Sequence, residues 1–256
     1  MYIEVKNVSL DYRQKNHIFR ALDDVSFNID KGEFICILGP SGCGKTTLLS
    51  AMAGFTEVSS GTITIDGRLV KGPRVENIIL FQNYGLLPWR NVRGNVALGL
   101  ENNRVPKNEI PAIVDKYIRL VGLEDFATSH PHQLSGGMQQ RVTLARALAV
   151  NPEIIFMDEP FGALDIITRA NLQMELIRIW RVQQKTIVFV THDIDEAVYL
   201  ADKIVIMNSN PGRMKALVTV NLERNRDKTG KEFAHVRDNI LEIFEMKVQN
   251  FVEYYL

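Results

Sequence analysis

The segment at residues 39–46 constrains the fold of this chain more than any other. It is GPSGCGKT, it matches the pattern G-x-x-x-x-G-K-[ST], and it stands between the apolar run FICIL and the helical run TLLSAMAGF. Such a loop lets several backbone N–H groups converge on phosphates, and the following helix adds its positive end. A glycine turn without function is the alternative. The position between strand and helix favours a phosphate-binding loop and an α/β fold.

The chemistry of this loop predicts a nucleotide ligand. The Lys45 ammonium can reach the β and γ phosphates, and the Thr46 hydroxyl can hold Mg²⁺. ATP and Mg²⁺ are therefore the expected ligands. The loop residues predicted to bind nucleotide are Gly39, Pro40, Ser41, Gly42, Cys43, Gly44, Lys45, Thr46 and Thr47.

Composition narrows the class of protein. The 30 basic residues balance 30 acidic ones, and no run of lysine and arginine stands out, so we expect no nucleic-acid partner. The two cysteines, Cys36 and Cys43, suggest neither a disulfide framework nor a metal site and fit a reducing cytosol. The N-terminal alternation predicts a strand rather than a signal peptide. No apolar run reaches the ~18 residues of a spanning helix, so work at a membrane would require docking onto another protein.

Hydrophobic patterns divide the chain into strand-rich and helical parts. Helical spacing dominates from Asn91 to Val150, and a further helix is predicted from about Thr168 to Arg181. Apolar runs near the end alternate with helices, as in a parallel sheet. The predicted strands are Tyr2 to Val8, Val25 to Ile29, Phe34 to Leu38, Thr62 to Ile65, Asn77 to Phe81, Ile154 to Met157, Thr186 to Val190 and Lys203 to Met207.

A second motif, IIFMDEP, ends an apolar strand with two carboxylates, Asp158 and Glu159. An acidic pair alone is more typical of a solvated turn. Downstream of a phosphate-binding loop, Asp158 is expected to complete the Mg²⁺ shell and Glu159 to polarise the water that attacks the γ-phosphate.

A third motif, LSGGMQQR at residues 134–141, precedes the helical run VTLARALAV. Ser and two Gly at a helix N-terminus form a second cradle for an anion, although an ordinary helix cap is the alternative. One triphosphate cannot use two cradles of the same chain, which makes a second subunit the natural source of the other phosphate contact.

These three motifs, at residues 39–46, 134–141 and 154–160 along the chain, resemble those of the ABC ATPases over essentially the whole chain. The resemblance implies a P-loop NTPase fold with a RecA-like core, an antiparallel β subdomain and a helical subdomain. It also implies a head-to-tail homodimer that sandwiches two ATP molecules. The implied single domain, 1–256, comprises 2–88 and 151–220 as core and β subdomain, 89–150 as helical subdomain with the third motif, and 221–256 as C-terminal helical extension.

Further site residues follow from the same resemblance. Gln82 resembles a glutamine that senses Mg²⁺ and the attacking water, His192 a γ-phosphate contact, and Tyr12 the aromatic that stacks on adenine, with Phe19 as its competitor. The implied catalytic residues are Glu159, His192 and Gln82; nucleotide-binding residues beyond the loop are Tyr12, Gln82 and Asp158; metal ligands are Thr46, Gln82 and Asp158; and contacts to the nucleotide of the partner subunit are Ser135, Gly136, Gly137, Gln139 and Asp165.

The segments LLPWRNVRGNV, DEPFGALDIITRANLQMELIRIW and SNPGRM resemble ATPases of nitrate, sulfonate and taurine importers. This implies integral membrane permease subunits as partners, an extracytoplasmic solute-binding protein as an indirect partner, and a peripheral place on the cytoplasmic face of the inner membrane. The expected permease contact includes Leu86, Leu87, Pro88 and Trp89, unless Trp89 packs inside the helical lobe. The transported substrate stays open.

Other interpretations remain at this point. A non-transport ABC ATPase acting on ribosomes or DNA, and a small-molecule kinase, are the competing functions. Cys43 is hypothesised to be a reactive thiol that ATP protects from alkylation. The polar stretch between Leu222 and Glu232 is interpreted as a solvated connector. One apolar helical face is predicted to pack on its own domain or to meet a partner, and it carries Phe233, Val236, Ile240, Phe244, Val248, Phe251 and Tyr255.

Overall fold

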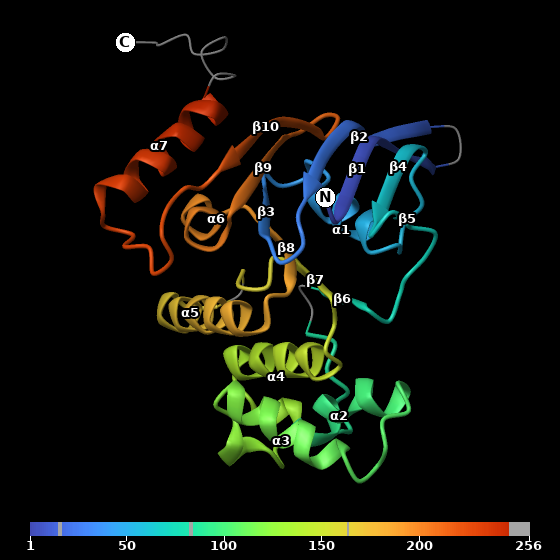
Figure 1. Ribbon diagram of the computed structural model, residues 1–256, viewed down its shortest axis with the longest axis vertical. Helices are drawn as coiled ribbons and strands as arrows, with labels where there is room; N and C mark the ends of the chain where they lie inside the picture. The colour runs from blue at the N-terminus through green and yellow to red at the C-terminus, as the bar shows by residue number, and fades with distance from the viewer. Residues whose placement is uncertain (15–16, 82–83, 163, 246–256) are drawn as a thin grey trace. The chain divides into compact units, whose positions relative to one another are not determined.

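The computed structural model describes residues 1–14, 17–81, 84–162 and 164–245. The chain forms two compact units, and Figure 1 labels their helices and strands. The first unit combines Met1–Met52, Thr56–Lys71 and Phe189–Leu256, and the second combines Ala53–Phe55 and Gly72–Val188. Among the described residues, no helix is both long enough and apolar enough to cross a bilayer.

The first unit contains an antiparallel sheet in the order β2-β1-β4-β5. Pairing of β1 with β2 places Tyr12 directly opposite Phe19 and Asp11 opposite Arg20. A register shift lies between Leu10 and Asp11. The strands are β1 (Ile3–Gln14), β2 (His17–Ile29), β4 (Ser60–Ile65) and β5 (Arg68–Leu69).

The first unit also contains strands of a mixed sheet. Its strands run in the order β10-β9-β3-β8, with β3 parallel to β9 and β9 antiparallel to β10. All five residues of β3 are buried, as expected for a strand covered on both faces. The bounds are β3 (Phe34–Leu38), β8 (Thr186–Thr191), β9 (Lys203–Asn208), β10 (Arg213–Thr219), α1 (Lys45–Met52), α6 (Ile194–Leu200) and α7 (Lys231–Glu245).

In the second unit, β6 and β7 pair in parallel and the first half of β8 follows β7 in the strand order. Helices α2, α3 and α4 lie together as a helical layer (Figure 1). The bounds are β6 (Asn77–Leu80), α2 (Val92–Asn102), α3 (Ile110–Leu120), the 3-10 turns η1 (Glu124–Phe126) and η2 (Pro131–Gln133), α4 (Gly136–Ala149), β7 (Ile154–Asp158) and α5 (Ile166–Gln183).

The predicted α/β fold is confirmed, but β1 and β2 extend beyond the predicted strands, and β5 and β10 were not predicted. The first part of β2, His17–Arg20, is exposed and therefore carries no hydrophobic alternation. Its strand conformation comes from pairing with β1. Strand β10 was not predicted, because its residues are only half-buried and it pairs with β9 at the edge of the sheet order.

The interpretation of the stretch between Leu222 and Glu232 as a solvated connector is confirmed for most of its residues, which are exposed, but it is wrong at Arg226. Arg226 is 7% exposed, and its guanidinium donates hydrogen bonds to backbone carbonyls of the α6 C-terminus and of the chain after β10. In α7, Phe233 and Ile240 are buried, which supports packing on its own unit over the described length. The predicted face positions Val248, Phe251 and Tyr255 lie outside the described residues.

Candidate nucleotide-binding site

The first unit holds the phosphate-binding loop between β3 and α1, as the sequence predicts. Gly42 and Gly44 have φ angles of 78° and 90°, a backbone region that side chains disfavour. The Lys45 Nζ atom donates hydrogen bonds to the Gly39 carbonyl at 2.8 Å and the Pro40 carbonyl at 3.0 Å. The loop therefore wraps around its lysine and keeps Ser41, Gly42 and Thr46 exposed.

Tyr12 reaches toward this loop. Its hydroxyl donates a hydrogen bond to the Thr47 Oγ1 atom at 3.4 Å, in the first turn of α1. Tyr12 and Phe19 are 41% and 59% exposed and directly opposed across β1 and β2, so both rings lie on one face of the hairpin. The contact with Thr47 favours Tyr12 as the ring nearer the phosphate-binding loop.

His192 also belongs to the first unit. It is exposed at the end of β8, just before Asp193 caps α6 by accepting a hydrogen bond from the Glu196 N–H at 3.1 Å. The buried hydroxyl of Thr191 donates to the Glu196 carboxylate at 2.7 Å. These bonds fix the turn that presents His192.

The acidic pair lies in the second unit at the end of β7. Asp158 is buried and Glu159 is partly exposed. Glu159 has a φ angle of 44°, in the left-handed region, although it precedes Pro160, and residues before proline favour extended backbone. Strain of this kind is typical of functional positions and supports a special role for Glu159.

The third motif opens α4 in the second unit. Ser135 is the N-cap, and its hydroxyl accepts a hydrogen bond from the Met138 N–H at 3.3 Å. The Gln139 amide donates to the carbonyls of Pro131 and Leu134. Ser135 and Gly136 are exposed, so the positive end of α4 is open to an anion.

The second unit also brings Asp165 to this motif. A Cβ atom on Gly137 would lie 2.5 Å from the Thr168 Cγ2 atom of α5. The exposed Asp165 caps α5 by accepting hydrogen bonds from the N–H groups of Ile167 and Thr168. Hydrogen bonds from Thr168 to the Asp165 carboxylate lower the pKa of Asp165, and the bond from the Thr168 backbone has a larger effect than the bond from its side chain. The absence of a side chain at Gly137 therefore lets α4 and the start of α5 pack closely.

The remaining predicted residues are Gln82 and the permease contact around Trp89. Gln82 lies outside the described residues. Trp89 is 73% exposed, so the alternative that it packs inside the helical lobe is wrong. Pro88 is exposed, and Leu86 and Leu87 are half-buried. The predicted permease contact is thus an accessible apolar surface.

The hypothesis of a reactive Cys43 is wrong in its premise of access. The Cys43 side chain is 0% exposed, and its sulfur lies 2.7 Å from where a Cβ atom on Gly39 would stand. Cys36 is also buried, and burial raises the pKa of its thiol well above the usual value. Neither thiol can meet a reagent in solution.

We therefore expect a disulfide reagent such as dithionitrobenzoate to modify almost no thiol in the native protein, and both thiols once urea unfolds it. The measurement is the absorbance of the released thiolate with time. Rapid native release of one equivalent, suppressed by ATP, would restore the reactive-thiol hypothesis.

The residues present fit Mg²⁺ and ATP. In the first unit, the exposed Thr46 hydroxyl is a hard oxygen of the kind that Mg²⁺ prefers as a ligand, and in the second unit the Asp158 carboxylate is another. Within the described residues no group of three or more His, Cys, Asp or Glu side chains could hold a metal. Mg²⁺ commonly keeps several water ligands and is held by one or two protein groups together with substrate phosphates.

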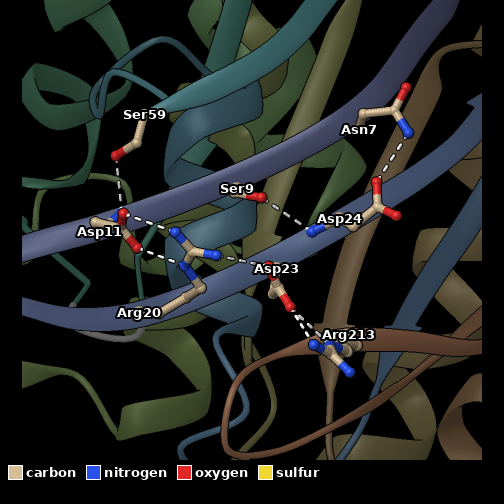
Figure 2. A network of polar contacts seen from close by, with 8 residues as sticks. All are labelled: Asn7, Ser9, Asp11, Arg20, Asp23, Asp24, Ser59 and Arg213. Carbon is tan, nitrogen blue, oxygen red and sulfur yellow. Dashed lines mark hydrogen bonds and ion pairs between the residues drawn. The ribbon is translucent and has the colours of Figure 1, made fainter.

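One polar network beside the site carried no motif and was missed. Figure 2 shows Asp11, Arg20, Asp23 and Arg213 joined by hydrogen bonds and ion pairs in the first unit. Hydrogen bonds from Arg213, and to a lesser extent from Arg20, lower the pKa of Asp23. A hydrogen bond from Arg20 also lowers the pKa of Asp11. Three members of this network, Asp11, Arg20 and Asp23, lie near Tyr12 in the sequence. Arg213 is distant in the sequence, so the sequence alone does not indicate that it joins them.

Comparisons with known proteins agree on one family. The model of the family described as ABC transporter matches residues 22–162. An uncharacterized ABC transporter ATP-binding protein of Methanocaldococcus jannaschii is 48% identical, covering 96% of this chain and 92% of that protein. The taurine import ATP-binding protein of Rhizobium johnstonii is 46% identical, with 86% and 87% covered. The nitrate import ATP-binding protein of Synechococcus elongatus is 47% identical, with 75% and 70% covered.

A solved structure that is similar to this chain is also an ATP-binding cassette. It is a dimeric ATP-binding cassette in a post-hydrolysis state, bound to ADP and Pi, with a TM-score of 0.76 and 32% sequence identity. The alignment covers 86% of this chain and all of the solved chain.

Proposed function

Because the chain belongs to the ABC transporter family and is an ATPase, we propose that it is the energising subunit of an importer for a small solute. One observation carries the proposal. The chain has two exposed helix N-termini built for anions, the loop before α1 in one unit and the Ser135-capped start of α4 in the other. Relatives named for taurine and nitrate import support a related solute.

In the proposed mechanism, two copies form a head-to-tail homodimer with two ATP molecules between them. Lys45 and the loop N–H groups bind the phosphates, and Tyr12 stacks on the base. When bound, Mg²⁺ neutralises charge on the phosphates, and Thr46, Gln82 and Asp158 would hold it. The start of α4 and Asp165 serve the nucleotide of the partner subunit.

Hydrolysis is proposed to depend on groups at two strand ends. Glu159 accepts the proton of the attacking water, and His192 contacts the γ-phosphate. The strained backbone at Glu159 and the fixed, exposed turn at His192 support these roles. We propose that the single ATPase domain divides into a core and β subdomain at 2–88 and 151–220, a helical subdomain at 89–150 and a C-terminal helical extension at 221–256.

We further propose that the segment around Trp89 docks a permease helix at the cytoplasmic face of the inner membrane. An exposed Trp beside an exposed Pro is the type of residue that anchors an interface. An extracytoplasmic solute-binding protein would act through the permease. A ribosome- or DNA-directed ATPase is the competing function.

Affinity purification of the tagged chain from its native membranes in mild detergent, with mass spectrometry of its partners, tests this function. We expect a polytopic permease to copurify with the chain. Trp89→Ala should weaken the affinity for the permease by about thirtyfold and lower permease recovery accordingly, because an anchoring Trp contributes ~2 kcal/mol to an interface. The matched control is Phe126→Ala, a 41% exposed aromatic of the same unit, which should leave recovery unchanged. Ribosomal or DNA-bound proteins without a permease would contradict the proposal.

A further inference from the structure

The polar network of Figure 2 joins two segments of the first unit that the proposed function assigns to the nucleotide. One is the β1–β2 hairpin, which carries Tyr12. The other is the phosphate-binding loop, against which the turn at Gly212 packs. Asp23 is the residue between them.

The Gly212 turn is in direct contact with the loop and with β2. A Cβ atom on Gly212 would lie 2.2 Å from the Cys43 carbonyl oxygen, so only a glycine fits there without movement of the loop. The Gly212 N–H donates to the Ala21 carbonyl at 3.0 Å, and the Asp23 N–H donates to the Gly212 carbonyl at 2.9 Å. The turn, β2 and the loop thus form one backbone-packed assembly.

The Asp23 carboxylate connects this assembly to Arg20 and Arg213 through hydrogen bonds. One oxygen accepts a hydrogen bond from the Arg20 Nη1 atom at 3.0 Å, and the other accepts from the Arg213 Nε atom at 2.8 Å and from its Nη2 atom. The Asp23 side chain is 15% exposed, whereas the side chains of Arg20 and Arg213 are more than half exposed. One carboxylate therefore holds two arginines from different parts of the chain.

Arg20 carries the connection to the base-contacting strand. Its Nε and Nη2 atoms donate to the two Asp11 carboxylate oxygens at 2.8 Å and 3.1 Å, a two-pronged contact that fixes direction as well as distance. Tyr12 follows Asp11 on β1. Since neighbouring strand residues face opposite sides, the ion pairs brace the hairpin from the side opposite the Tyr12 ring.

We propose that Asp23 is a positioning residue, which sets the distance between the Tyr12 ring and the phosphate-binding loop. The inference rests on the proposed role of Tyr12. A nucleotide gains affinity from base contacts and phosphate contacts together only when the protein groups that make them are already held at the right distance from each other. The arginine partners of Asp23 are more than half exposed, and ion pairs with such partners contribute little to stability, so the main effect of Asp23 is on nucleotide affinity.

The test compares ATP with inorganic tripolyphosphate, which has phosphates but no base. Asp23→Asn should weaken ATP binding by about fivefold, a part of the stacking contribution of a base, and leave tripolyphosphate binding within about twofold. In ATPase assays the KM should rise by about the same factor, with kcat unchanged. The matched control is Asp24→Asn, because the Asp24 carboxylate accepts from Asn7 at 2.8 Å instead of from an arginine.

A double substitution tests the route through Tyr12. Tyr12→Ala alone should weaken ATP binding by about tenfold. Asp23→Asn added to Tyr12→Ala should change it no further, because the ring that Asp23 positions is gone. Arg213→Gln, at a more exposed residue, should reproduce the KM effect if Asp23→Asn does not fold.

The inference would be overturned if both Asp23→Asn and Arg213→Gln kept the wild-type ATP affinity, or if Asp23→Asn lost equal affinity for ATP and for tripolyphosphate. It would also be overturned if Asp24→Asn lost as much ATP affinity as Asp23→Asn. The same holds if the losses in the double variant were additive, or if Tyr12→Ala left ATP affinity unchanged. A wild-type chain that binds no ATP would instead refute the proposed function. The two failures are therefore distinguishable.

Discussion

Glu159→Gln should bind ATP with wild-type affinity and hydrolyse it at least about 100-fold more slowly, because a glutamine cannot accept the proton of the attacking water. The amide keeps the size of the carboxylate and its place after β7, where the left-handed backbone holds it. ATP binding and steady-state phosphate release on the same preparation measure the two quantities. An ATP-bound dimer should accumulate, detectable by size-exclusion chromatography, since closure is no longer followed by hydrolysis.

The control for this experiment is Glu153→Gln, which removes the same charge just before the start of β7. It should hydrolyse ATP at the wild-type rate. Normal turnover by Glu159→Gln would show that another group is the base. Equal losses in both variants would point to net charge rather than to proton transfer.

Arg226→Met should lower the free energy of unfolding by about 3 kcal/mol, because it leaves several buried carbonyls without a donor. The Arg226 Nη1 atom donates to Val198 and Ala201, each at 2.6 Å, and to Tyr199 at 3.2 Å. These carbonyls belong to the last turn and end of α6, where the helix leaves its own acceptors unpaired. Burial lowers the pKa of Arg226 to about 10, which still leaves it charged at neutral pH.

Urea and thermal unfolding measure this loss. For a chain of this size, the expected decrease in Tm is about 6–12 °C. Arg226→Lys, which keeps a charge but lacks the planar fork, should be intermediate. Arg237→Met on α7 removes an equally charged but more exposed side chain and should change stability by less than about 0.5 kcal/mol. An unchanged Tm for Arg226→Met would contradict the capping role.

The elements that sequence predicts best are those whose pattern reports burial directly. Strand β3 is apolar throughout, is buried throughout, and has the predicted bounds. The loop after it follows from glycines whose backbone angles few other residues adopt. The exposure of Trp89 also agrees with the prediction of a docking surface.

The errors come from interactions between residues distant in sequence. The polarity of the segment around Arg226 suggests solvent, but its partners are carbonyls 25 to 28 residues earlier. The direction of the Cys43 side chain depends on how the loop packs, which no local pattern reports. Likewise, Asp23 meets Arg213 across 190 residues of chain. Hydrophobic periodicity contains no information on such pairs.

The first unit is assembled from both ends of the chain, and this has a consequence for synthesis on the ribosome. Its sheet requires β9 beside β3, and α6 gains its cap only when Arg226 has emerged. The second unit is almost continuous in sequence, from Gly72 to Val188. During translation from the N-terminus, the second unit can therefore complete its contacts first. The phosphate-binding loop, although translated early, has to wait for the last quarter of the chain before its surroundings are complete.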